Sequence, residues 1–125
     1  MNHVQTWVKV NAPIDTGIAE LVELLNEFPA VQTIESCQGT ESEAAWVAFW
    51  CGEHWRRPWE DLCEFVFGYL GPKMTATLGN AISLQVIITE NGGIQGELTV
   101  QPGAMRPTVQ ALKLLLTNYQ ARGLP

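Results

Sequence analysis

The feature that most constrains this chain is an Asn-Gly-Gly turn at residues 91–93, which separates two runs of alternating side chains. Apolar residues occupy every second position from Ile82 to Ile88, and Leu98 and Val100 repeat that spacing after the turn. Such alternation is typical of a strand with one buried face, and Asn-Gly between two such runs favours a tight antiparallel hairpin. We therefore expect an antiparallel sheet around which the other elements must fit.

A second hairpin is predicted upstream of the first. The segments Val31–Cys37 and Ala45–Cys51 are strand-like, and a short link with the polar residues 38–43 joins them. Alternating β-branched residues predict one further strand over Val4–Asn11.

Three amphipathic segments predict helices. Asp15 is suited to cap the first helix, because its carboxylate can accept a hydrogen bond from a backbone N–H of the first turn, and Pro29 ends this helix. Pro58 opens the second helix, and Gly71-Pro72 is expected to close it. Pro107 opens the third helix, whose apolar residues recur at helical spacing: Val109, Leu112, Leu115, Leu116 and Tyr119.

These elements follow one another in the order β-α-β-β-α-β-β-α, and the 125 residues suit a single domain over residues 1–125. We therefore expect an α+β fold, in which an antiparallel sheet with helices has a ferredoxin-like β-α-β-β-α-β arrangement, extended by an added strand and a C-terminal helix. In that arrangement the first and second strands run parallel, and the first and third strands are neighbours.

The charge of the chain limits its partners. Thirteen acidic and seven basic residues give a formal net charge of −6, and the basic residues are scattered apart from Arg56-Arg57. Binding to nucleic acid or to an anionic membrane needs a clustered basic face, so we expect neither. The sequence also lacks an apolar run of membrane-spanning length and a secretory signal at its start, and three cysteines in such a chain favour reduced thiols in the cytoplasm.

The turn Ser36-Cys37-Gln38-Gly39 is the first candidate site. In the predicted sheet it shares an edge with Asn11 and with the helix start at Asp15. Backbone N–H groups at a helix start can hold an anionic group, so these residues form a candidate site for a small ligand. The alternative is a half-buried turn cysteine with a structural role, since no histidine lies nearby in the sequence to activate the thiol.

The same region resembles known proteins. The run Leu24–Thr33, followed by Ser36-Cys37-Gln38-Gly39, resembles a segment of uncharacterised bacterial proteins. It is also similar to the wybutosine-synthesising methyltransferase family, in which a helix ending in Leu-Asn leads to a strand and a Ser-Cys-x-Gly turn. This resemblance implies S-adenosylmethionine and a tRNA base as substrates, and it assigns Ser36, Cys37 and Gly39 to a ligand-contacting turn. The chain departs from the family in having Glu35 where the family has serine, and in lacking a basic residue after Gly39.

Cysteine and histidine also occur close together at Cys51 and His54, with Cys63 further along the chain. A closed zinc site needs four ligands, and Cys63 falls on the apolar stripe of the second helix, so we predict no metal site. The sequence has no glycine-rich phosphate loop and no hydrolase nucleophile motif, and it assigns no cofactor.

Three tryptophans form the second candidate site. Trp7, Trp46 and Trp50 fall opposite the strand positions that are expected in the core. A bare aromatic patch commonly marks an interface, and this pattern predicts a homodimer formed through one face of the sheet. The alternative is that the C-terminal helix covers the tryptophans as a second small core.

Two functions therefore stay open. One is a small homo-oligomeric binding module that uses the tryptophan-bearing face of the sheet. The other is a small enzyme or ligand-binding domain centred on the turn 36–39. The first is favoured, because the sequence offers no base beside the thiol that nucleophilic catalysis would need.

Overall fold

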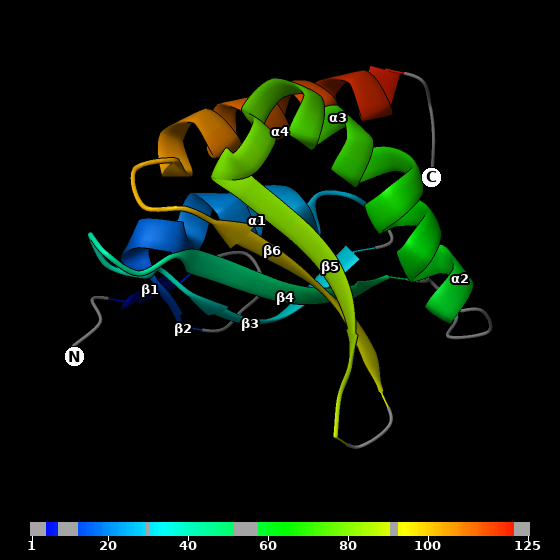
Figure 1. Ribbon diagram of the computed structural model, residues 1–125, viewed down its shortest axis with the longest axis horizontal. Coiled ribbons are helices and arrows are strands. Elements are labelled where there is room, and N and C mark those ends of the chain that lie inside the picture. Colours follow the sequence, from blue (N-terminus) through cyan, green and yellow to red (C-terminus); the bar gives the residue numbers. More distant parts are fainter. Residues whose placement is uncertain (1–4, 8–12, 30, 52–57, 91–92, 122–125) are drawn as a thin grey trace.

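The computed structural model describes residues 5–7, 13–29, 31–51, 58–90 and 93–121, and it has an α+β fold (Figure 1). The strands are β1 (Gln5–Trp7), β2 (Pro13–Asp15), β3 (Val31–Cys37), β4 (Ala45–Cys51), β5 (Ile82–Ile88) and β6 (Ile94–Val100). The helices are α1 (Ala19–Asn26), α2 (Pro58–Cys63), α3 (Gly71–Leu78) and α4 (Met105–Ala121). A 3₁₀ turn (Thr16–Ile18) precedes α1, a π-helical segment (Glu64–Leu70) joins α2 to α3, and a second 3₁₀ turn (Gly79–Ala81) leads into β5. No helix of the described residues is long and apolar enough to cross a membrane.

Four strands form one antiparallel sheet in the order β3-β4-β6-β5. Both predicted hairpins are confirmed, because β3 pairs with β4 and β5 pairs with β6. The β5–β6 turn is closed by a hydrogen bond of 2.8 Å from the Thr89 backbone N–H to the Gly93 carbonyl. The pairing of β4 with β6 joins the two hairpins, so these two strands are the centre of the sheet.

The first strand does not join this sheet. β1 pairs with β2 in a separate two-stranded sheet, and β2 contacts β3. The prediction that the first and third strands are neighbours is therefore wrong, and the ferredoxin-like arrangement is not confirmed. The physical reason is that a strand has two edges, and those of β4 are occupied by β3 and β6. Residues 8–11 of the predicted first strand lie outside the described part of the chain.

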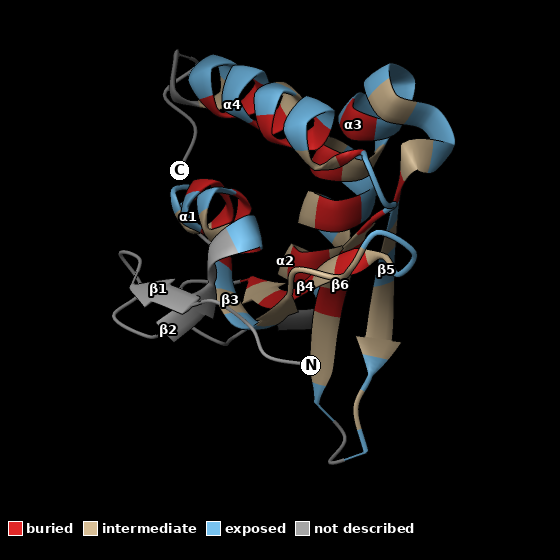
Figure 2. Cartoon of the chain, turned by 90° about the vertical axis from the view of Figure 1, so that its left-hand side faces the viewer, coloured by how far each residue is buried: buried red, intermediate tan, exposed pale blue. Residues whose placement is uncertain are grey.

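The core lies between the sheet and a layer of helices on one of its faces (Figures 1 and 2). Val47 and Phe49 of β4 are fully buried on this face, together with Leu98 of β6. Helix α4 contacts α1 and α3 and contributes Leu112 to the same core. The alternative in which the C-terminal helix covers the opposite face is therefore not observed.

A single side chain ties the end of α1 to the sheet. The Asn26 amide donates to the Val22 carbonyl at 3.0 Å and to the Thr33 hydroxyl at 2.8 Å. Its oxygen accepts a 3.0 Å hydrogen bond from the Thr33 backbone N–H. The Asn26 carboxamide therefore links the last turn of α1 to Thr33 of β3.

The second predicted helix does not end at Gly71-Pro72. Helical structure continues from α2 through the π-helical segment into α3, and Pro72 lies in the first turn of α3. The proline therefore does not end the helix, although it has no N–H to donate to the preceding turn. Gly71 is essential to this geometry, since a Cβ at this position would lie 2.5 Å from the Val66 carbonyl oxygen.

Candidate functional site

The β3–β4 turn is a tight, hydrogen-bonded structure. Gly39 has a φ of 69°, and a Cβ there would lie 2.5 Å from the Glu43 carbonyl oxygen, so only glycine fits. The Thr40 backbone N–H donates to that same carbonyl at 3.0 Å, and the Thr40 hydroxyl accepts a bond from the Glu43 backbone N–H. The turn is therefore held in one conformation by its own backbone.

Gln38 connects this turn to the start of the first helix. The Gly17 backbone N–H donates to the Gln38 Oε1 atom at 2.8 Å, although the two residues are 21 positions apart. The structure thus brings the turn beside the 3₁₀ turn that follows Asp15, although the shared sheet edge that was expected is absent, because the first strand is not in the four-stranded sheet. However, the Gly17 N–H, which belongs to the predicted anion-holding helix start, is bonded to Gln38.

The predicted cap at Asp15 is not the cap of α1. The N-cap residue is Ile18, which has no side-chain capping hydrogen bond, because a 3₁₀ turn separates Asp15 from the α-helix. Asp15 is the last residue of β2, and Trp7 is the last residue of β1. Asn11, the remaining predicted residue of this edge, lies outside the described residues.

Ser36 and Cys37 do not converge on one site. Ser36 pairs with Val47, whose side chain faces the core, and Cys37 pairs with Trp46 on the opposite face. Directly paired residues of two neighbouring strands share a face of the sheet. The Ser36 hydroxyl and the Cys37 thiol therefore belong to opposite faces.

The three thiols have different surroundings. Cys51 is fully buried, and this burial, with a smaller contribution from the Asp61 carboxylate, raises its pKa from 9.0 to about 12. Cys37 and Cys63 are both half-buried, whereas Cys63 was expected in the core. Within the part of the chain that the structure describes, no three His, Cys, Asp or Glu residues gather as metal ligands, and His54 lies outside that part.

The face of the sheet away from the helices carries the tryptophans of β4. Trp46 and Trp50 are half-buried and flank Ala48, which is only 1% exposed. Across the sheet, Trp46 pairs with Thr99 and Ala48 pairs with Glu97. We call this surface, formed by Cys37, Trp46, Ala48, Trp50 and their polar neighbours Gln85, Glu97 and Thr99, the tryptophan face.

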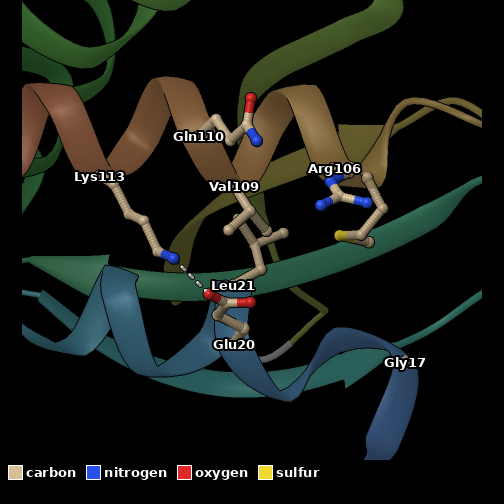
Figure 3. A pocket seen from close by; sticks show the side chains of 8 residues that line it. Gly17, Glu20, Leu21, Arg106, Val109, Gln110 and Lys113 are labelled. Carbon is tan, nitrogen blue, oxygen red and sulfur yellow. Dashed lines mark ion pairs between the residues drawn. The ribbon is translucent and has the colours of Figure 1, made fainter.

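A second surface feature was missed by sequence reasoning. A groove of about 430 Å³ lies between the start of α1 and the first turns of α4 (Figure 3). Its lining residues are Gly17, Glu20, Leu21, Met105, Arg106, Val109, Gln110 and Lys113. One signal could have indicated it: Arg106 stands in the first turn of a helix, where the helix dipole disfavours a cation.

Comparisons with models of protein families, with curated proteins and with solved structures found no match. The resemblance of the segment 24–39 to the wybutosine-synthesising methyltransferases therefore stays a prediction.

Proposed function

We propose that this protein is a homodimeric interaction module whose two copies meet through the tryptophan face. The observation that carries the proposal is the one-sided arrangement of the fold. Helices α1, α3 and α4 lie on the same face of the sheet, and Trp46 and Trp50 lie on the other. A sheet normally buries at least one face, but large aromatic side chains on the second face favour a partner there as well.

The chemistry of the tryptophan face suits a protein interface. Its aromatic part lies over β4, and its margin over β5 and β6 is polar, including Gln85 and Glu97, whose side chains approach to 3.5 Å. An apolar centre with a polar rim is the usual anatomy of such contacts. In a two-fold contact both copies contribute the same patch, so each tryptophan is buried once in each copy. At about 25 cal/mol per Å², burial of the area that these rings still expose contributes on the order of a few kcal/mol to the free energy of dimerisation.

The test is the oligomeric state of Trp46→Glu. We expect the mass measured by light scattering to change from that of a dimer to that of a monomer, because a buried carboxylate would oppose association from both copies. The far-ultraviolet circular dichroism should stay native, since Trp46 lies outside the helix-covered core. Leu114→Glu is the matched control: Leu114 is 65% exposed on α4, and this variant should remain dimeric.

Two results would overturn the proposal. One is a wild-type protein that stays monomeric at high concentration. The other is dissociation caused by Leu114→Glu but not by Trp46→Glu, which would place the contact on the helical layer.

Ligand binding near the turn 36–39 is the second candidate function. It is favoured by one contact, the Gly17–Gln38 hydrogen bond, which sets the turn beside the groove between α1 and α4. In its methyltransferase-like form, the ligand is S-adenosylmethionine, and calorimetric titration with this compound is the test. A saturable heat of binding supports that form, and the lack of one removes it.

A further inference from the structure

The groove between α1 and α4 has an apolar base. Leu21 of α1 and Val109 of α4 are both buried, and Met105 is half-buried beside them. The volume of about 430 Å³ lies within the range that is typical of small-molecule sites. The groove therefore fits a small molecule with an apolar body.

The walls of the groove carry positive charge in an acidic protein. The structure describes three basic side chains, those of Lys73, Arg106 and Lys113, and two of them line this groove. Lys113 forms an ion pair of 2.7 Å with Glu20, and both side chains are more than half exposed. Such an exposed pair contributes little stability, so a ligand can compete for the Lys113 ammonium.

Of the two basic residues that line the groove, Arg106 is the one that has no ion pair within the described residues. Figure 3 shows it at the end of the groove near Gly17, and the Lys113–Glu20 pair lies at the other end. A guanidinium presents two parallel N–H donors that match the two oxygens of a carboxylate. An anion here would also relieve the unfavourable position of Arg106 in the first turn of α4, because the helix dipole favours negative charge at that end.

From these observations we infer that the groove is a binding site for a small organic carboxylate with an aliphatic body. Arg106 binds the carboxylate, and Leu21, Val109 and Met105 contact the aliphatic part. The site lies in the helical layer, away from the tryptophan face, so that it does not depend on the proposed dimer.

The experiment is a titration of the ¹⁵N-labelled protein with acetate, butyrate and hexanoate, followed by amide chemical shifts. Hexanoate should bind tightest, with a gain of roughly threefold to fourfold for each added methylene. The shifts should centre on Gly17, Leu21 and Val109. Inorganic phosphate is the comparison anion, and it should bind more weakly than hexanoate because it has no apolar part.

Three variants assign the roles of the charged residues. Arg106→Gln should weaken hexanoate binding at least tenfold, since it removes the bidentate donor. Lys73→Gln makes the same change of charge on α3, where the ammonium lies 5.3 Å from the Tyr69 ring centre, and it should leave binding unchanged. Glu20→Gln should strengthen binding severalfold, because it removes a negative charge on the groove wall that repels the carboxylate of the ligand.

The inference is wrong if none of the carboxylates shifts the groove amides at about 50 mM. Equal binding of acetate, hexanoate and phosphate would also overturn it, since that result describes a charge effect without an apolar site. Equal weakening by Lys73→Gln and Arg106→Gln would do the same. All of these outcomes leave the oligomeric state unchanged, so the failure of this inference is distinguishable from the failure of the proposed dimer.

Discussion

At the scale of single residues, the burial of a side chain decides its chemistry more than its place in a motif. Cys37 belongs to the turn that first suggested a site, yet it lies on the tryptophan face and shares no face with Ser36. Cys51, whose only functional pattern was the metal site that the sequence argued against, is the fully buried thiol, and its burial raises its pKa to about 12. Its neutral form is stabilised by the apolar core around it.

The titration of Cys51 should make stability depend on alkaline pH. Below about pH 9 the thiol is protonated in the folded and the unfolded chain, and its full contribution to stability is present. As the pH rises from 9 toward the folded pKa of about 12, the unfolded chain releases a proton that the folded chain keeps, so the unfolding equilibrium constant increases about tenfold per pH unit from this group. Urea unfolding at about pH 8 and 10 should therefore show a smaller loss of stability for Cys51→Val than for the wild type. Equal losses in both proteins would contradict the assignment.

At the scale of elements, the helical segment 58–78 shows how a local break signal can be overridden. Gly71-Pro72 would end an ordinary α-helix, but the chain passes through a π-helical segment immediately before it. The Gly71 backbone N–H bonds to the Val66 carbonyl, five residues earlier. The wider turn brings that carbonyl so close to Gly71 that a side chain would not fit.

Two glycines of this segment provide a matched test. Gly71→Ala should destabilise the protein by about 1–3 kcal/mol, because the new methyl group would meet a backbone oxygen that cannot move cheaply. Gly68→Ala should be neutral or should stabilise by up to about 1 kcal/mol, since a Cβ there lies 3.9 Å from its nearest neighbour and alanine favours helix. Thermal unfolding measures both. If Gly71→Ala is as stable as Gly68→Ala, the segment is not π-helical at this point.

At the scale of the whole molecule, the sequence predicts the structure that neighbouring residues determine, and it misses the contacts between segments that are far apart in the chain. The two hairpins and the last helix follow from spacing and turn residues that lie close together in the chain. The strand order depends on the β4–β6 pairing, which joins segments separated by a long helical stretch, and no local pattern encodes it. The groove was missed for the same reason, because its walls come from residues 17–21 and 105–113. Trp46 and Trp50 share the face away from the core, since parity within one strand is a local property, whereas Trp7, predicted beside them, belongs to the separate two-stranded sheet.

The position of the first strand gives the sharpest test of the whole fold. A chain that begins at Pro13 keeps all four strands of the sheet and helices α1 to α4. We therefore expect it to keep a native circular dichroism spectrum and a cooperative thermal transition, with a midpoint lowered by less than about 5 °C. Removal of an equal length at the other end, residues 114–125, should abolish cooperative unfolding, because Leu115 and Leu116 belong to the core. A truncated chain from Pro13 that fails to fold would mean that the first strand is a central strand, as the ferredoxin-like arrangement requires.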